Sequence, residues 1–346
     1  MTSLIHTISH SWQPFVLITG LLFIGHVAAR EGLFESVGRL IARTPGNDVM
    51  LFVVTMVAVA VVTALLNLDT SVVFMTPVAM NAVRARDGDE IAFAFGAILM
   101  SNAASLLLVG SNLTNMLVFA THPVRGTVFV SHMALAWVTS VALTIVIVAV
   151  WRRRPLTRAA QASSEHVTWH VGPGTLAVLA AVALMLLTSQ PALPVFAIGA
   201  ILEAVDLVVR HKVGWREILE VASPLVVIPL FVVAVLVGWL GRHWHGASHL
   251  IAHANSLTTA AVSGALSLVI NNLPAASLFA SQPVAHPYAL LIGLNLGPNA
   301  FVTGAMSTML WFRLIRGEGL SPTIWQFVGI GLPVTVVTVI VSSLFV

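Results

Sequence analysis

The feature that most constrains this chain is its succession of apolar stretches long enough to cross a lipid bilayer. A membrane-spanning helix needs about 20 apolar residues, because each residue adds about 1.5 Å toward roughly 30 Å of hydrocarbon. Of the 346 residues, 58% are hydrophobic and only 8% are charged, whereas about a quarter are charged in an ordinary globular domain. The sequence therefore predicts an all-α polytopic membrane protein, which we expect in a bacterial inner membrane.

Six of the stretches are uninterrupted and typical of ordinary spans: residues 14–29, 133–150, 174–189, 192–209, 221–240 and 323–346. Four more contain Asn, Asp, Pro, Gly or Ser among their apolar residues. Non-helical backbone at membrane depth is tolerated only where it is buried in protein or lines a cavity, because its polar groups find no water there. We expect re-entrant hairpins at about 50–83 and 256–280, and interrupted membrane-spanning helices at about 91–120 and 288–312.

The order of these stretches repeats once along the chain. A span, a hairpin, an interrupted helix and another span occur twice, in opposite orientations, with hairpin tips at Asn67-Leu68-Asp69-Thr70 and Asn272-Leu273-Pro274-Ala275. Inverted repeats with paired broken helices build a central binding site in secondary transporters.

We expect residues 1–151 to form the first repeat, residues 152–172 a cytoplasmic linker, and residues 173–346 the second repeat. The second repeat begins with two extra helices at about 174–209. Because nothing equivalent precedes the first repeat, we expect that two starting helices are missing.

The basic residues predict the orientation of the chain. If the hairpins enter from opposite faces, all sixteen Lys and Arg residues except Arg125 and Arg242 fall on one side, and positive loops mark the cytoplasm. Both termini would then face outward. The positive charge thus reports topology, and we expect no nucleic-acid partner. The absence of Cys excludes disulfides and thiolate sites, and we predict no metal site and no cofactor.

The helix interruptions locate the expected binding site. N-termini of half-helices offer free N–H groups and partial positive charge to an oxyanion, while Asn, Ser and Thr oxygens can coordinate a cation. The candidate substrate- and ion-binding residues are the polar ones at the breaks: Asn67, Asp69, Thr70, Ser71, Ser101, Asn102, Ser111, Asn112, Thr114 and Asn115, then Asn271, Asn272, Asn295, Asn299, Thr303, Ser307 and Thr308. The alternative is that each one only holds helices together through hydrogen bonds.

Asp69 is the most informative single residue, because it is the only carboxylate within either expected hairpin. An acid at membrane depth is costly unless it is used or paired. We expect Asp69 to carry the coupling proton or cation. The alternative is that it caps the second half of its hairpin as the N-cap residue.

Three segments resemble the arsenite permease family of the ion transporter superfamily. They are Gly110-Ser111-Asn112-Leu113, Asn271-Asn272-Leu273-Pro274 and Asn295-Leu296-Gly297-Pro298, the last followed by Gly304 and by Thr308-Met309-Leu310-Trp311. The resemblance covers nearly the whole chain, in order. It implies ten or more helices with two inverted hairpins, and efflux of arsenite or antimonite by proton exchange or with an ATPase subunit. The family pattern often has acids where this chain has Asn102 and Asn295.

We therefore predict a secondary active transporter that exports arsenite or antimonite oxyacids, driven by protons. Its partners would be a small inorganic anion, a coupling proton or cation, and membrane lipid, with an ATPase subunit and a second copy of the chain as candidate assemblies. The alternatives are a sodium- or proton-coupled transporter of another anion (dicarboxylate or sulfate), a sodium/proton antiporter, and a transport-inactive membrane subunit. No zinc-protease, nucleophile-elbow or phosphate-loop pattern is present, so we predict no enzymatic activity.

Overall fold

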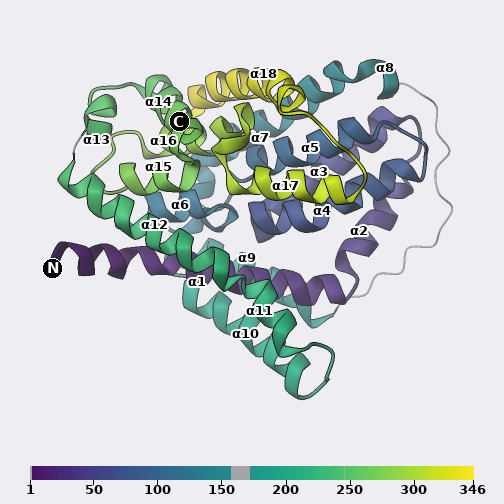
Figure 1. Ribbon diagram of the computed structural model, residues 1–346, viewed down its shortest axis with the longest axis horizontal. Coiled ribbons are helices and arrows are strands. Elements are labelled where there is room, and N and C mark those ends of the chain that lie inside the picture. The colour runs from purple at the N-terminus through teal and green to yellow at the C-terminus, as the bar shows by residue number, and fades with distance from the viewer. Residues whose placement is uncertain (1, 157–171, 245) are drawn as a thin grey trace.

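The computed structural model describes residues 2–156, 172–244 and 246–346, and within them every regular element is a helix (Figure 1). The first half contains α1 (Thr2–Arg30), α2 (Leu33–Ala42), α3 (Asp48–Leu66), α4 (Leu68–Arg84), α5 (Glu90–Ala104), η1 (Val109–Ser111), α6 (Leu113–Val118), α7 (Gly126–Trp151) and α8 (Arg153–Leu156). The second half contains α9 (Pro173–Leu187), α10 (Ala192–Val208), α11 (Trp215–Ala222), α12 (Pro224–His243), α13 (Gly246–Ile251), α14 (Ser256–Ile270), α15 (Asn272–Phe279), α16 (Pro287–Leu296), η2 (Gly297–Ala300), η3 (Val302–Gly304), α17 (Met306–Gly317), α18 (Ile324–Ser342) and η4 (Ser343–Phe345).

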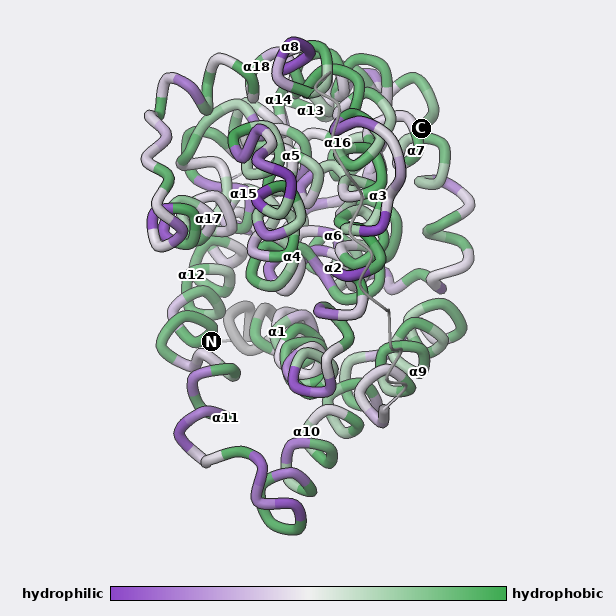
Figure 2. The backbone as a smooth tube through the Cα atoms, turned by 90° about the vertical axis from the view of Figure 1, so that its right-hand side faces the viewer, coloured by the Kyte–Doolittle hydropathy of each residue, from purple (hydrophilic) through white to green (hydrophobic). Residues whose placement is uncertain are grey.

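The helices are those of a multi-pass membrane protein. Five segments of the described chain are long and apolar enough to cross a bilayer: Ser11–Arg30, Asp48–Leu66, Gly126–Trp151, Trp215–His243 and Ile324–Phe345. Hydrophobic colour runs along most helices in Figure 2, while α8 and α11 are marked by hydrophilic segments. Large apolar side chains point away from the protein, with Leu225 90% exposed and Leu187 70% exposed. Such surfaces are suited to lipid contact.

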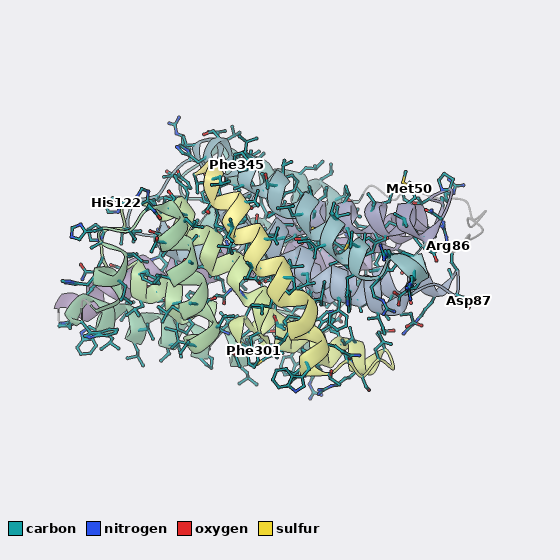
Figure 3. The ribbon with its side chains drawn as sticks, turned by 90° about the horizontal axis from the view of Figure 1, so that it is seen from above. Met50, Arg86, Asp87, His122, Phe301 and Phe345 are labelled. Carbon is teal, nitrogen blue, oxygen red and sulfur yellow. The ribbon has the colours of Figure 1, made fainter. Side chains whose placement is uncertain are left out.

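Both expected hairpins are present. In the first, α3 runs up to Asn67 and α4 returns, so that Met50 lies at the same end of the molecule as Arg86 and Asp87 in Figure 3. Arg86 Nη2 fastens this end by donating to the carbonyl oxygens of Ala42, at 2.9 Å, and Thr44, at 2.5 Å.

The second hairpin consists of α14 and α15 and turns at Asn271. Its open end is marked by Ser256 Oγ, which lies 3.4 Å from Nδ1 of His286, just before α16. This end faces the left of Figure 1, whereas the open end of α3 and α4 faces the right. The two hairpins therefore enter from opposite ends, as an inverted arrangement requires.

The interrupted helices also lie where the sequence predicts them. In the first, α5 ends at Ala104 and α6 begins at Leu113, with η1 between them. In the second, α16 ends at Leu296 and α17 begins at Met306, with η2 and η3 between them. Residues 92–104 of α5 and 289–296 of α16 are all buried, so these two segments form the centre of the molecule.

Close packing of two backbones explains why one position of this core is glycine. A Cβ atom on Gly293 of α16 would lie 2.0 Å from the carbonyl oxygen of Ala260 in α14. Only glycine fits there, and its absent side chain lets the second hairpin lie directly against the second interrupted helix.

Several short helices were not expected from the sequence. α2, α11 and α13 are too short for a span and lie in segments that we expected to be connections. Of the expected cytoplasmic linker, α8 covers the first residues, and residues 157–171 lie outside the described chain. The first span is also longer than expected, because α1 begins at Thr2 and not near residue 14.

Candidate functional site

Four helices begin at one small cavity in the middle of the molecule. Its lining consists of Leu68 and Asp69 of α4, Asn112, Leu113 and Thr114 at the start of α6, Asn271, Asn272 and Leu273 at the start of α15, Ala305, Met306 and Ser307 at the start of α17, and Leu230 of α12. The two hairpins and the two interrupted helices each contribute one of these starts. The four breaks in the sequence are thus brought together in space.

Asparagines form the turns from which three of these helices begin at the cavity. Asn67 and Asn271 adopt positive φ values of 136° and 75° with ψ values of 173° and 152°, a conformation that strains side chains and is nearly restricted to glycine. Each then caps the helix that follows it: the Asn67 side chain accepts from the Thr70 amide at 2.9 Å, and that of Asn271 accepts from the Leu273 amide at 3.3 Å. Asn112 caps α6 in the same way, through the Thr114 amide at 3.2 Å.

The start of α17 differs from the others. Its N-cap residue is Ala305, which has extended backbone and offers no side-chain cap. The first amides of a helix have no partner within the helix, and their aligned dipoles give the N-terminus partial positive charge. Ser307, which lines the cavity, is only 2% exposed, and its hydroxyl has no hydrogen-bond partner within the described chain.

Asp69 is the only charged residue among the described residues that line this cavity. It lies in the first turn of α4 and is half-buried. The N-cap of α4 is Asn67, so the structure does not support the alternative in which Asp69 caps the hairpin. No hydrogen bond or ion pair joins Asp69 to another described residue. The described lining of the cavity therefore presents one carboxyl group, amides, hydroxyls and helix N-termini, and no basic side chain.

A second group of predicted residues forms a buried amide network that joins the two repeats. Asn112 Nδ2 donates to Asn295 Oδ1 at 2.9 Å, Thr114 Oγ1 donates to the same oxygen, and Asn295 Nδ2 donates to Asn115 Oδ1 at 2.6 Å. Farther from the cavity, Asn102 Nδ2 donates to Asn299 Oδ1 at 2.8 Å. These asparagines hold the two interrupted helices together, which is the packing role that the sequence left open.

The other predicted residues bond to their own surroundings. Ser101 Oγ donates to Ala97 O at 2.8 Å, Ser111 Oγ to Ala64 O at 3.1 Å and Thr303 Oγ1 to Leu268 O at 2.9 Å. The Thr70 hydroxyl is buried and has no partner within the described residues. Of the seventeen candidate residues, six line the cavity: Asp69, Asn112, Thr114, Asn271, Asn272 and Ser307.

Some residues that line the central cavity were not predicted from the sequence. Leu230 lies in the uninterrupted span α12 and carries no polar signal. Ala305 and Met306 are apolar and contribute mainly through the backbone of a helix start. The only sequence signal for Ala305 and Met306 is the position of the helix break at residues 297–305.

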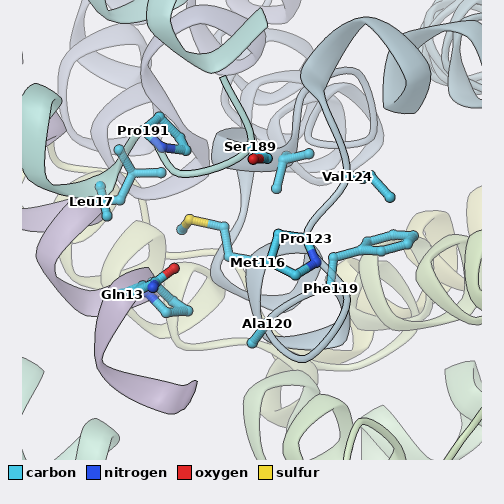
Figure 4. Close-up of a pocket in the computed structure, with 12 residues that line it drawn as sticks. Gln13, Leu17, Met116, Phe119, Ala120, Pro123, Val124, Ser189 and Pro191 are labelled. Atoms are coloured by element: carbon cyan, nitrogen blue, oxygen red, sulfur yellow. The ribbon is translucent and has the colours of Figure 1, made fainter. Parts of the chain in front are cut away.

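A second hollow is chemically different. Figure 4 shows Leu17, Met116, Phe119 and Val124 around it, with Gln13 and Ser189 as its polar members. None of its described lining residues is charged. Because no titratable group is among the described residues that line this hollow, the central cavity is the better candidate for ion-coupled binding.

Known proteins share this architecture. The sequence profile of the citrate transporter family, CitMHS, matches residues 2–303. An arsenical pump membrane protein of Escherichia coli is 24% identical over 366 residues, which cover 96% of this chain and 85% of that protein. An uncharacterised transporter of Mycobacterium tuberculosis is 22% identical, with 98% and 86% covered. In fold, the chain is similar to the YdaH transporter of Alcanivorax borkumensis, with a TM-score of 0.57, 15% identity, and 99% and 86% of the two chains covered.

Proposed function

The chain belongs to the CitMHS citrate transporter family, and from that premise we propose that it exports arsenite or antimonite oxyacids in exchange for protons. That it is a membrane transporter and not an enzyme follows from its family, its relatives and its spans. The nature of the cargo and of the coupling ion is the proposal.

The observation that carries the proposal is the composition of the central cavity. Its lining combines Asp69 with the amides and hydroxyls of Asn112, Thr114, Asn272 and Ser307, and includes no basic residue. The trivalent oxyacids of arsenic and antimony are uncharged near neutral pH and carry several hydroxyl groups, each of which both donates and accepts hydrogen bonds. Amides and hydroxyls satisfy both functions. A multiply charged anion would instead face the Asp69 carboxylate with no neutralising side chain.

The cavity is also small. It encloses about 40 Å³, enough for roughly three water molecules when each occupies about 10–15 Å³ in the same measure. An inorganic oxyacid has this size. The names of several relatives, each an arsenical pump membrane protein, support the same cargo.

Asp69 supplies the coupling in this proposal. A single carboxyl group that lines the cargo cavity and has no ion-pair partner among the described residues can hold either a proton or a hydrogen-bonded cargo molecule. If the proton and the cargo cannot occupy Asp69 at the same time, the site carries cargo outward and the proton inward in alternate steps. This alternation is the requirement for exchange.

The family description favours a second candidate, an organic acid such as citrate. Sulfate and dicarboxylates belong to the same class of charged cargo, and sodium is the alternative coupling ion. For these anions the positive ends of α4, α15 and α17 would have to replace basic side chains.

Accumulation of arsenite and antimonite in exporter-deficient cells tests the cargo directly. Cells that express the chain should hold less of both than cells with empty vector, and added citrate or sulfate should not change the difference. Equal accumulation despite membrane insertion would contradict the arsenite proposal. A difference abolished by citrate would favour the organic acid.

Independence from an ATPase subunit is a separate proposal. Proteoliposomes that contain only this chain should transport arsenite when a proton gradient is imposed, without nucleotide. Transport that requires an added ATPase and ATP would contradict it, and would instead support the pump assembly.

A further inference from the structure

A polar hollow lies between the central cavity and the left-hand end of the molecule in Figure 1, where α6, α12 and α15 run side by side. The charge distribution of the sequence predicts that this end is the outer face. Its polar groups come from Ser11 of α1, Thr121 after α6, Arg242 of α12, Ser277 of α15 and Ser281 just after α15. We call it the outer hollow.

The same three helices line both the central cavity and the outer hollow, in continuous register. On α12, Leu230 lines the cavity, and Ala234, Gly238 and Arg242 follow at steps of four residues in the outer hollow. On α15, Leu273 lines the cavity and Ser277 the outer hollow, and on α6 Leu113 and Leu117 do the same. Ser281 and Thr121 line the hollow just beyond the ends of these two helices. Residues four apart lie on one ridge of a helix. Three ridges therefore face one seam that joins the two spaces.

The length of this seam fits a path from the middle of the membrane to its surface. Twelve residues separate Leu230 from Arg242, which corresponds to about 18 Å along α12 at about 1.5 Å per residue. Half of the hydrocarbon thickness is about 15 Å. The side chain of Arg242 thus reaches the outer boundary when Leu230 lies near the centre.

The seam is closed in this structure. Leu117, Ala234 and Ser277, the lining residues of the outer hollow that lie nearest the cavity along the three helices, are at most 5% exposed. At the outer end, a Cβ atom on Gly241 would lie 2.4 Å from Ser281 Oγ, and Gln282 Nε2 donates to Gly241 O at 3.2 Å. α12 and α15 also pack against each other along their length, so opening the seam requires these two helices to separate by a few ångströms. Small side chains line most of the seam.

The hydrogen bonds of the outer hollow indicate what it can hold. Ser277 Oγ donates to Leu273 O at 3.0 Å, and Ser281 Oγ donates to Leu278 O at 2.6 Å. Their hydroxyl hydrogens are thus engaged, and their lone pairs remain to accept a hydrogen bond. Arg242 can only donate. A ligand that bonds to the serine oxygens and also to the Arg242 guanidinium must carry hydroxyl hydrogens and an oxygen acceptor, as a protonated oxyacid does.

We propose that the seam between α6, α12 and α15 is the path by which cargo leaves the central cavity, and that the outer hollow around Arg242 is a second, transient binding site for the departing oxyacid. The path requires only that the chain is a transporter. The nature of the ligand in the outer hollow rests on the proposed function.

Single cysteines test the path, because the natural chain contains none. Ser277→Cys places a thiol in the seam, and Ser140→Cys, on α7, is a matched control that is equally buried but bonds to Ala103 away from the seam. A membrane-impermeant methanethiosulfonate is added to the outer face without cargo, because trivalent arsenic itself binds thiols. The mass of the intact protein reports labelling.

The path predicts labelling at Ser277→Cys roughly tenfold or more faster than at Ser140→Cys, because minor open states expose only the seam. Labelled Ser277→Cys should also lose transport. Ala234→Cys is a second seam variant, for use if Ser277→Cys does not insert. If both seam cysteines label no faster than the control, the path is contradicted whatever the cargo is, so this result differs from failure of the arsenite assay.

Arg242→Gln tests the outer hollow, and Arg125→Gln is its control, since Arg125 is the other basic residue predicted to face outward and is exposed. In right-side-out vesicles the transporter is run in reverse, so that arsenite enters from the outer face. Arg242→Gln should then need roughly tenfold more arsenite for its half-maximal uptake rate, as expected for loss of one charge-assisted hydrogen bond. The control should be unchanged. Equal arsenite requirements in the two variants would overturn the second site.

Discussion

At the scale of single residues, the membrane-depth asparagines serve two roles that their sequence positions do not distinguish. Asn67, Asn112 and Asn271 cap helices at the cavity, whereas Asn102, Asn115, Asn295 and Asn299 bond across the repeats or to carbonyl groups. Asn112 does both, because it also donates to Asn295. The breaks could be predicted because Asn, Pro and Gly interrupt apolar runs. Which of these amides faces the cavity could not be predicted, because that depends on contacts between residues about 180 positions apart.

Asn295 is the residue on which the buried network most depends. Asn295→Leu would leave the amides of Asn112 and Asn115 and the Thr114 hydroxyl without this partner. We expect a loss of about 1–3 kcal/mol in unfolding free energy, the cost of unsatisfied buried groups. Thermal unfolding in detergent measures it.

The control for this change is Asn81→Leu, because Asn81 is exposed on α4. It should leave the unfolding midpoint nearly unchanged. Equal midpoints for the two variants would show that the network does not stabilise the fold.

At the scale of elements, the interruptions are what the sequence predicts best, and the short helices what it predicts least. Polar residues within an apolar run need an internal partner, so they mark hairpins and broken helices. α2 and α11 are short amphipathic helices between spans, and length and hydropathy alone do not distinguish them from loops. Leu230 was missed for a related reason, because an apolar residue in a regular span carries no sign of the cavity that it faces.

The tip of the first hairpin offers a test at this scale. Asn67 has φ 136° and ψ 173°, a conformation that is nearly restricted to glycine. Asn67→Gly loses the cap, a few tenths of a kcal/mol, but relieves the backbone strain that Asn67 bears, so its unfolding midpoint should not fall. Asn67→Ala loses the cap, about 1 kcal/mol, and keeps the strain.

Thermal unfolding of both variants beside the natural chain measures the difference. Asn67→Gly should unfold near the natural midpoint and Asn67→Ala clearly below it. If both fell by the same amount, the strain at the hairpin tip would be disproved.

At the scale of the whole molecule, ion pairs gather at the end that the sequence predicts to be cytoplasmic. Arg84 Nη1 lies 2.5 Å from Glu318 Oε2 and so joins the two repeats. Arg152 donates to Asp89 at 2.5 and 2.7 Å, and these bonds raise the pKa of the Arg152 guanidinium above its ordinary value. Arg30 bonds to Glu203 at 3.1 Å and to Asp206 at 2.9 Å, and thereby holds α1 to α10.

Arg30→Met should be the more costly of two arginine changes at this end. Glu203 is 2% exposed and Asp206 3% exposed, so loss of Arg30 removes a cation that both buried carboxylates share, at about 3 kcal/mol. His26 remains beside Glu203 and Arg210 beside Asp206. Arg39→Met removes a pair whose acid, Glu35, is 76% exposed, and should cost about 1 kcal/mol or less. Unfolding midpoints that fell equally would contradict this ranking.

The central claim is that the half-buried carboxyl group of Asp69 couples proton movement to cargo export. It is tested most directly in everted membrane vesicles with an acidified interior, where a pH-sensitive dye reports protons that leave as arsenite enters. Asp69→Asn is compared with the natural chain and with Asp87→Asn, the same substitution at an exposed position just after α4. We predict that arsenite releases protons from vesicles with the natural chain and with Asp87→Asn, and not from those with Asp69→Asn. Proton release by Asp69→Asn equal to that of the natural chain, at equal membrane insertion, would contradict the claim.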